Sequence, residues 1–372
     1  MVSRRTLLTG TLAGAGLIGA GLAGVGPDGA QAARAAQRTA RQDAPMTSAP
    51  GATHPHGHRS RPGSPTVLIA TNEPWGTYHV RPLVDAAARR GIRIVQLVPD
   101  TSVIDPDDTV ETATPDDAPP ANLLVVTGAA DWPADCAARL SRLPVAASSL
   151  AYLNPQQAPR AHELRSRLRV ITSSSPAEAR AFSSYLGSHR RVRVVGSPQT
   201  DHLPVHRPEP DTVLVLTSVT YPDETGGAAP GTELLLACAE RLAAAGAHVV
   251  VGMHPREDPS LWDRYEISDV PSVQAAGRAE AAIGIPGTVF PLIVAAGVPV
   301  VGCVDPALTV PDYLLDVCSS TIDDAALAVG AVGTAELPGE DVRYDAIGPV
   351  GGSADRLLDA WERAARPHPQ RR

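Results

Sequence analysis

The sequence predicts an α/β protein with two Rossmann-like, doubly wound parallel-sheet domains that face a central cleft. Short runs that are apolar throughout alternate with helical segments from residue 66 onward, and parallel strands buried on both faces have this appearance. The alternation stops at a Pro-rich stretch, 204–211, and then restarts. The chain has 372 residues, of which 43% are hydrophobic, so its length and composition allow two cores.

Each predicted element of the first half has a local reason. Gly91 closes the first helix, because glycine is favoured just past a helix end. Asp131 is expected to cap the helix DWPADCAARLSRL, and Ser175 forms a capping box with Glu178 at the start of PAEARAFSSYLG. An acidic, Pro-rich surface loop is predicted at 100–120. The predicted strands of this half are 66–71, 92–99, 122–128, VAASSLAYL and RVITSS, and the segment 191–201 ends the half.

The second half repeats the pattern. Predicted strands at 212–218 and 248–253 flank the helix GTELLLACAERLAAAG, which Gly246 closes. A short strand is predicted near PSVQ, followed by the helix-like AAGRAEA, the strand AAIGIPG, a helix that Thr288 begins and the strand VPVVGCV. The predicted divisions of the chain are a signal peptide at 1–32, a disordered linker at 33–64, an acceptor-type domain at 65–205, a donor-type domain at 211–350 and a C-terminal helix and tail at 351–372.

The N-terminus has the pattern of a targeting segment. Arg4-Arg5 precedes a Gly/Ala/Leu run, and Ala30-Gln31-Ala32 is a small-x-small cleavage pattern. Paired arginines with mild hydrophobicity resemble a twin-arginine export signal, which predicts a secreted or cell-envelope protein. The alternative is an uncleaved membrane anchor. In the linker, His54, His56 and His58 suit either weak metal binding or a solvated tail.

Composition excludes several chemistries. The net charge of -8 argues against broad binding to nucleic acid or to an anionic membrane. All 32 Lys-plus-Arg positions are arginine, which excludes a Schiff-base lysine and a Walker-type lysine. No spacing typical of a metal site joins the four cysteines, which suit small buried hydrophobes or a disulfide. They are Cys136, Cys238, Cys303 and Cys318. We therefore expect neither metal nor cofactor.

The stretch HVVVGMHPRED carries the first candidate site. His254 and Arg256 follow directly after an apolar strand, and ligands bind at the carboxyl ends of the strands in open parallel sheets. Arginine offers a bidentate fork to phosphate oxygens and histidine donates one or two hydrogen bonds. The alternative is a surface turn with a local Arg256–Glu257 ion pair.

Two further segments of the second half are predicted to reach the same place. Gly287 permits a tight turn and Thr288 opens a helix, whose free N–H groups suit phosphate. Plain N-capping by Thr288 is the alternative, and the two interpretations are compatible. Ser218 and Thr220 follow the first strand of this half and suit either phosphate contact or a plain loop.

The first half offers two candidate bases. His79 lies at the start of the first predicted helix, where an imidazole can act as a general base or as a structural hydrogen-bonding residue. Glu73, in the preceding loop, is the other candidate. Asp201, at the end of this half, is expected to cap a helix or to hold the hinge.

Taken in order, these motifs resemble the two-domain glycosyltransferase fold called GT-B. His254-Pro255-Arg256 and Gly287-Thr288, followed by LIVAAGVPVVG, resemble the donor-binding half of the CDP-glycerol glycerophosphotransferase, polysialyltransferase-like and UDP-N-acetylglucosamine 2-epimerase group. VVGSPQTDHL looks like the Gly-x-Pro-x-x-Asp segment that ends the first domain in that group. HVRPLVDAAARRGIRI is similar to the Gly-His-x-x-Pro-Leu helix start of nucleotide-sugar transferases. The resemblance covers residues 66–302.

The resemblance implies roles for single residues. His254 and Thr288 would contact the donor phosphates, Arg256 would support that site, and His79 would deprotonate an acceptor hydroxyl. Three departures stand against it. Tyr78 replaces the Gly before the histidine, Phe290-Pro291 stands where related enzymes often carry an acidic residue, and no acidic base motif of the sialyltransferase type is present.

The function predicted first is a transferase that uses a nucleotide-activated sugar or polyol phosphate to build a cell-surface polymer on a glycan-like acceptor. An exported, non-catalytic GT-B-like protein that binds a glycan or phosphorylated ligand is the second. A nucleotide-sugar epimerase is the third. The export signal conflicts with the first, because activated nucleotide donors are cytoplasmic.

Overall fold

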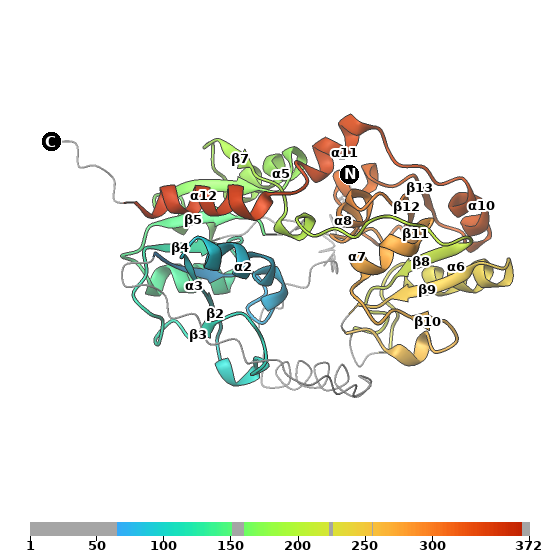
Figure 1. The fold of residues 1–372 in the computed structure, drawn as a ribbon, viewed down its shortest axis with the longest axis horizontal. Coiled ribbons are helices and arrows are strands. Elements are labelled where there is room, and N and C mark those ends of the chain that lie inside the picture. Colours follow the sequence, from blue (N-terminus) through green and yellow to red (C-terminus); the bar gives the residue numbers. More distant parts are fainter. Residues whose placement is uncertain (1–64, 151–159, 223–225, 255, 367–372) are drawn as a thin grey trace, which may run out of the picture.

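The computed structural model describes residues 65–150, 160–222, 226–254 and 256–366. It contains two α/β domains, each built on one parallel sheet, which confirms the predicted fold class (Figure 1). The expected signal at 1–32 and the linker at 33–64 with its three histidines lie outside the described residues. Within the described ranges, no helix combines the length and apolar character needed to cross a membrane.

The first domain carries a seven-stranded sheet in the order β3-β2-β1-β4-β5-β6-β7. Its central strands are buried along their whole length because every residue in them is apolar or hydrogen-bonded. The strands are β1 (Thr66–Ala70), β2 (Arg93–Leu97), β3 (Thr112–Ala113), β4 (Leu123–Val126), β5 (Val145–Ser148), β6 (Leu168–Ser173) and β7 (Val192–Val194). The α-helices are α2 (Arg81–Arg89), α3 (Asp131–Arg139), α4 (Ala161–Leu164) and α5 (Pro176–Leu186).

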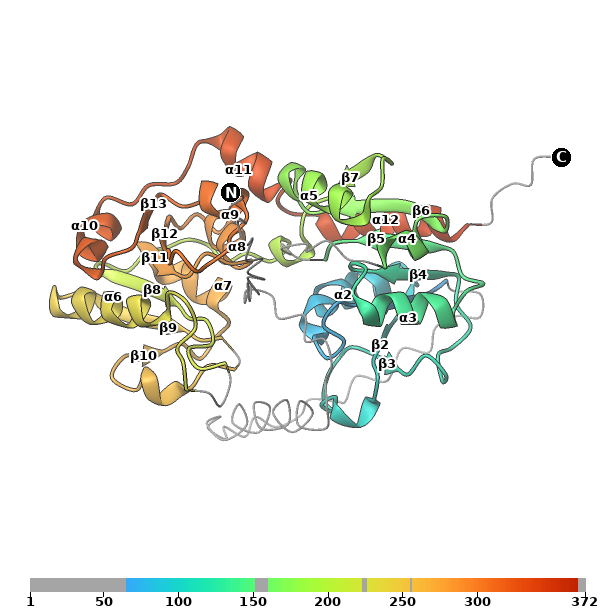
Figure 2. The same ribbon diagram turned by 180° about the vertical axis from the view of Figure 1, so that it is seen from behind.

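The second domain carries a six-stranded sheet in the order β10-β9-β8-β11-β12-β13. Its strands are β8 (Thr212–Leu216), β9 (His248–Gly252), β10 (Glu266–Ile267), β11 (Ala281–Gly284), β12 (Val300–Cys303) and β13 (Ser320–Ile322). The helices that follow the boundary are α6 (Thr232–Ala244), α7 (Ser272–Ala275), α8 (Phe290–Ala295), α9 (Asp312–Asp316), α10 (Ala328–Gly333), α11 (Glu340–Ile347) and α12 (Ser353–Ala365). Figure 2 shows both domains from behind.

Four local predictions were wrong. The segment PSVQ is helical in α7 instead of a strand, and the edge strand β10 precedes it. The surface loop 100–120 contains β3, which pairs with β2. Asp131 is the first residue of α3 and makes no capping bond, since Ala130 occupies the cap position. The helix expected from Thr288 begins at Phe290.

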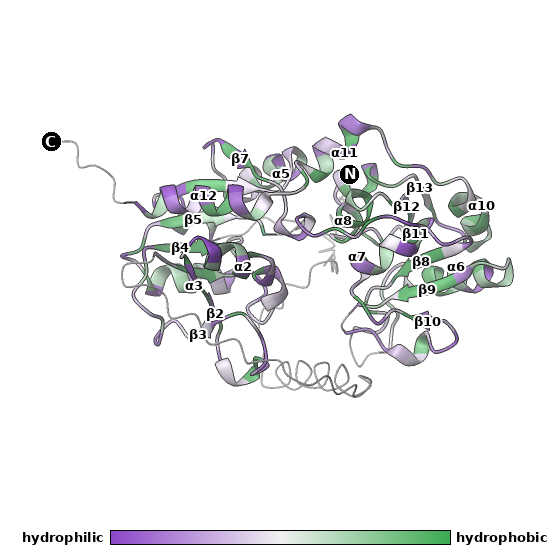
Figure 3. Cartoon of the chain, in the orientation of Figure 1, coloured by the Kyte–Doolittle hydropathy of each residue, from purple (hydrophilic) through white to green (hydrophobic). Residues whose placement is uncertain are grey.

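Hydrophobic residues are concentrated in the strands and in the helices that cover them (Figure 3). The C-terminal helix α12 crosses back from the second domain to the first (Figure 1). There Leu357 and Trp361 share a core with Val67 and Ile69 of β1. The indole N–H of Trp361 donates to the hydroxyl of Ser148 at 2.9 Å. The first domain is therefore completed by the last helix of the chain.

Two glycines allow this crossover to pass close to the first sheet. Gly196 has φ +84°, and a Cβ there would lie 2.3 Å from the carbonyl oxygen of Pro349. Gly348 has φ +78°, and its Cβ would lie 2.1 Å from the carbonyl oxygen of Ser174. Any other residue would force these backbones apart.

Asp201 fixes the start of α12. Its carboxylate accepts hydrogen bonds from the backbone N–H groups of Ser353 at 2.7 Å and Ala354 at 2.8 Å. A carboxylate is also favoured there by the helix dipole. Pro198 opens the 3-10 turn Pro198–Thr200 that leads to it. The segment VVGSPQTD thus ties the end of the first domain to the returning chain, as the expected capping or hinge role required.

A second connection joins α5 to α11. Arg180 and Asp345 form two parallel hydrogen bonds of 2.8 and 2.6 Å. Ala177 of α5 shares a core with Leu292 of α8 and Ile347 of α11. Apolar contact and a bidentate ion pair therefore hold the two domains together on this side.

The cysteines are all free in the structure. Cys136, Cys238 and Cys303 are buried, and Cys318 is half-buried. The sulfur atoms of Cys238 and Cys303 lie 3.9 Å apart in the core of the second domain. Their burial agrees with the interpretation of the cysteines as small hydrophobic side chains.

Candidate functional site

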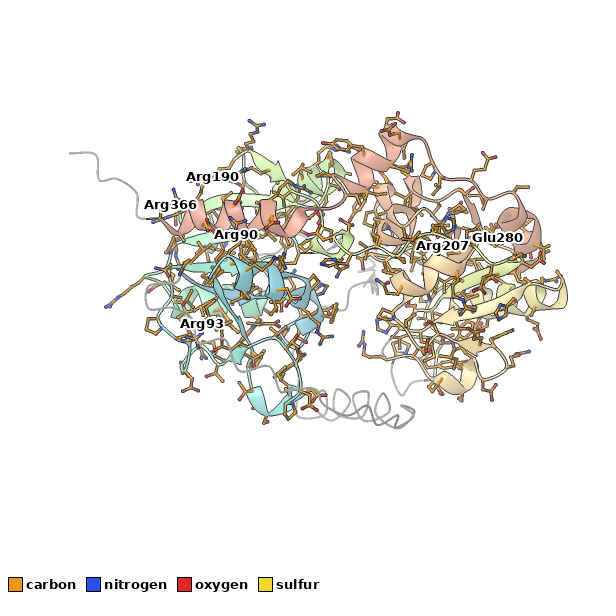
Figure 4. The ribbon with its side chains drawn as sticks, in the orientation of Figure 1. Arg90, Arg93, Arg190, Arg207, Glu280 and Arg366 are labelled. Atoms are coloured by element: carbon orange, nitrogen blue, oxygen red, sulfur yellow. The ribbon has the colours of Figure 1, made fainter. Side chains whose placement is uncertain are left out.

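The strand orders locate the place where a ligand would bind. Each sheet has a switch point, between β1 and β4 in the first and between β8 and β11 in the second. Ligands of open parallel sheets bind outside the carboxyl ends of the strands at such points. Arg93, which begins β2, and Glu280, which precedes β11, lie toward the outer sides of their domains (Figure 4). The carboxyl ends therefore lie on the sides that the domains turn to each other.

Buried polar groups form hydrogen bonds with the loop after β1 and hold it in place. Gln96 donates from its amide nitrogen to the carbonyl of Pro74 at 3.0 Å. The hydroxyl of Thr71 donates to the carbonyl of Glu73 at 2.6 Å. The N–H of Gly76 donates to the same carbonyl at 2.9 Å. These bonds place the Glu73 side chain in an exposed position at the end of the sheet.

His79 ends the 3-10 turn Thr77–His79, directly before α2. Its Nδ1 atom is buried and has no hydrogen-bond partner among the described residues. Burial lowers the pKa of this imidazole, and the Glu73 carboxylate acts in the opposite direction. The ring is thus neutral near neutral pH, and an acceptor hydroxyl could meet only the exposed part of this half-buried residue, away from Nδ1.

Tyr78 connects the two candidate bases. Its hydroxyl donates to Glu73 Oε2 at 2.5 Å, and its ring centroid lies 4.0 Å from that of His79. Partial burial of a residue that stays 49% exposed, together with the Glu73 carboxylate, raises the pKa of Tyr78. The phenol therefore stays protonated and holds the carboxylate in one orientation. The sequence showed Tyr78 only as a departure from the family pattern.

His254 follows β9 in the second domain. Its backbone N–H donates to the hydroxyl of Thr217 at 2.7 Å, which links the ends of β9 and β8. The backbone N–H of Arg256 donates to His254 Nδ1 at 3.2 Å. The ring proton of neutral His254 therefore lies on Nε2, where it can be donated to a phosphate oxygen.

The pKa of His254 reflects both domains. Burial, followed by the positive charge of Arg256, lowers it to about 4, whereas the carboxylate of Glu73 raises it. Arg256 offsets a small part of the rise in the pKa of Tyr78. Glu73 and Tyr78 of the first domain thus interact electrostatically with His254 and Arg256 of the second.

The alternative interpretation, a local Arg256–Glu257 ion pair, is wrong. Glu257 is buried, and its carboxylate accepts hydrogen bonds from the hydroxyl of Thr220 at 2.7 Å, from the N–H of Thr220 at 3.2 Å and from the N–H of Asp258 at 2.9 Å. The exposed side chain of Arg256 makes no ion pair within the part of the chain that the structure describes. Thr220 thus anchors the loop after β8 to the turn that carries His254.

The segment after β11 approaches the switch point from the other side. Thr288 is exposed and lies two residues before α8, whose cap residue Val289 receives no side-chain bond. Thr288 therefore does not cap this helix. Gly287 is not crowded, since a Cβ there would meet only a carbonyl oxygen at 3.6 Å. Ser218 is half-buried in the segment after β8, on the opposite side of the switch point.

Among the described residues, a metal site is absent and a surface hollow lies away from the switch point. No group of three His, Cys, Asp or Glu side chains in these ranges could hold a metal ion. A surface hollow of about 640 Å³ lies beside α5 and the edge strand β7. That strand is four positions away from β1 in the sheet, so the hollow lies away from the switch point.

Comparisons with known proteins support the architecture. No protein-family model and no characterised protein matches this chain by sequence. Solved structures do match by fold. A UDP-GlcNAc 2-epimerase from Methanocaldococcus jannaschii aligns with 80% of this chain and 99% of its own at 13% identity, with a TM-score of 0.52. The wall teichoic acid polymerase TagF, as a variant, aligns with 80% and 87% at 11% identity, with a TM-score of 0.53.

A calicheamicin glycosyltransferase aligns with 82% of this chain and all of its own at 17% identity, with a TM-score of 0.51. The chain therefore has the two-domain architecture of GT-B glycosyltransferase-like proteins. At these identities the likeness establishes the fold, and the chemistry has to be argued from the site.

The state of His254 provides a test of the site. We expect its imidazole to titrate near pH 4 by NMR, below the value of about 6.5 in an unfolded chain. As the pH falls below 6.5, the unfolded state binds this proton before the folded state does. His254 therefore lowers the free energy of unfolding progressively between about pH 6.5 and 4, and it has no effect on stability above pH 6.5. Arg256→Gln should raise this pKa and Glu73→Gln should lower it. A midpoint at or above 6.5 in the wild type would contradict the arrangement.

Proposed function

We propose that this protein is a GT-B-type transferase that uses a nucleotide-activated sugar or polyol phosphate. The observation that carries the proposal is the placement of His254 and Arg256 beside the second switch point, within electrostatic reach of Glu73 on the first domain. The solved structures of similar fold include an epimerase with UDP-GlcNAc and UDP and a TagF variant soaked with CDPG. They support a nucleotide donor.

In this proposal the second domain binds the donor. His254 Nε2–H donates to a phosphate oxygen without carrying a charge, and the Arg256 guanidinium neutralises the leaving nucleotide. The hydroxyls of Ser218 and Thr288 and the backbone at Gly287 complete the phosphate side. Thr220 acts through Glu257 by holding the loop in place.

The first domain would bind the acceptor. His79 or Glu73 takes the proton from an acceptor hydroxyl as its oxygen attacks the transferred sugar or polyol phosphate. The bond to the nucleotide breaks, and the electron pair leaves with its phosphate oxygen. Catalysis would come from positioning and charge neutralisation. A glycan-like acceptor for a cell-surface polymer fits this chemistry.

Nucleotide binding tests the proposal directly. CMP, CDP, UDP and GDP are compared by thermal shift, and at least one should raise the melting temperature. A ligand at 100 times its Kd adds about 2.7 kcal/mol of stability. His254→Ala should fold and lose the shift. His248→Gln is the matched control, because His248 begins the same strand, is 46% exposed and contacts Glu266.

The proposed transferase function is rejected if none of the four nucleotides raises the melting temperature of the wild type and His254→Ala is as stable as the wild type. A shift that survives in His254→Ala would also reject the assigned site. Stabilisation by a glycan or phosphorylated ligand alone would favour the non-catalytic binding protein.

We also propose export by the twin-arginine route, or attachment to the membrane through an uncleaved signal. This part of the proposal rests on Arg4-Arg5 and the small-residue pattern ending at Ala32. Cell fractionation with an Arg4→Ala/Arg5→Ala control tests it. Wild-type protein in the cytoplasmic fraction, unaffected by the double substitution, would reject export.

A further inference from the structure

The Glu73–Tyr78 pair has a place in the site that the proposed chemistry does not explain. Only one of the two candidate bases is needed to deprotonate an acceptor. Glu73 nevertheless receives the Tyr78 hydroxyl at 2.5 Å, and the same tyrosine ring packs on His79 at 4.0 Å. This charge-assisted hydrogen bond restrains the exposed carboxylate of Glu73 toward Tyr78.

The opposite side of the site offers the Arg256 guanidinium and the His254 ring N–H, while the neighbouring Glu257 carboxylate is buried and bonded to Thr220 and Asp258. The His254 ring is oriented by the backbone N–H of Arg256, so its Nε2–H is free to donate. Arg256 is exposed and forms no ion pair in the described ranges. The turn that carries His254 and the loop that carries Glu73 both follow the carboxyl ends of strands beside a switch point, and the Glu73 carboxylate acts electrostatically on His254.

A fixed carboxylate near an anion site has two physical effects. It repels an added phosphate and competes with it for the positive charge of Arg256. It also accepts hydrogen bonds but donates none. A ligand that carries a hydroxyl group beside its phosphate can donate a hydrogen bond to Glu73. That bond offsets the repulsion between the Glu73 carboxylate and the phosphate. A bare anion has no such group.

We propose that the Glu73–Tyr78 pair makes the site selective for phosphate esters that carry a free hydroxyl next to the phosphate, and disfavours simple inorganic anions. This inference rests on the proposed function only in placing the phosphate at His254 and Arg256. It assigns to Tyr78, the residue that departs from the family pattern, the role of orienting the carboxylate. Such a pair would keep a donor site from filling with free phosphate.

The test compares two ligands that share a phosphoryl group, inorganic phosphate and glucose 1-phosphate, by isothermal titration calorimetry. Glu73→Gln should strengthen phosphate binding about three- to tenfold at low salt, as expected for removing one nearby charge. Glucose 1-phosphate should gain less or lose affinity, so the preference for the ester falls. Most of the gain should vanish near 1 M salt, where the Debye length is about 3 Å.

Two further variants separate this role from a structural one. Asp85→Asn changes the charge of the same domain equally at an exposed position on α2 and should leave both affinities unchanged. Tyr78→Phe keeps the charge but frees the carboxylate, so the preference should fall less than with Glu73→Gln. Glutamine can still accept the Tyr78 hydrogen bond, so the fold should survive.

The outcomes are decisive. Equal or weaker phosphate binding by Glu73→Gln, or no phosphate binding by either protein, overturns the proposal. An equal effect of Asp85→Asn overturns it as well. If the nucleotide screen fails while these ratios change as expected, the transferase function is rejected and the selectivity stands.

Discussion

The crossing of the chain back to its first domain is the constraint on which the arrangement depends. Parallel strands place all their carboxyl ends at one edge of a sheet. Two such edges can act on one ligand only if the domains turn them toward each other. Gly196 and Gly348 allow the close approach of the returning segment, and Asp201 fixes the start of α12. The Arg180–Asp345 pair secures the other connection.

With the two sheet edges turned toward each other, a few hydrogen bonds determine the chemistry of the site. The N–H of Arg256 sets the tautomer of His254, and burial keeps that ring neutral. Buried Glu257 holds the loop after β8 against the same turn. The result is a surface of hydrogen-bond donors built from a neutral imidazole and an arginine, in a chain without lysine. Glu73 opposes it with a single oriented negative charge.

The sequence predicted the architecture well because its signals are local and repeated. Apolar strands alternate with helices, and glycines such as Gly91 and Gly246 mark helix ends with positive φ. The position of His254 followed from the end of an apolar run. Thr288 was misplaced relative to its helix, because α8 begins two residues later with Phe290 and Pro291. Proline is favoured in a first turn, and that signal could have corrected the boundary.

The contacts that could not be predicted are those between segments far apart in the chain. Nothing near Glu257 indicates that its carboxylate binds Thr220, 37 positions away. The ion pair with its neighbour Arg256, given as the alternative, used only local sequence. The Glu73–Tyr78 bond is local, but its proximity to Arg256 depends on how the domains face each other. Long-range packing decides such pairings, and single-sequence patterns do not contain it.

The most direct test of the central claim is a double-mutant cycle across the two domains. Inorganic phosphate affinity is measured for the wild type, Glu73→Gln, Arg256→Gln and the double variant. If Glu73 competes with the bound anion for the charge of Arg256, their effects should be non-additive by at least about 0.5 kcal/mol, with a smaller gain from Glu73→Gln when Arg256 is absent. Additivity within about 0.3 kcal/mol would mean that Glu73 and Arg256 do not interact at the anion site, and the account would be contradicted.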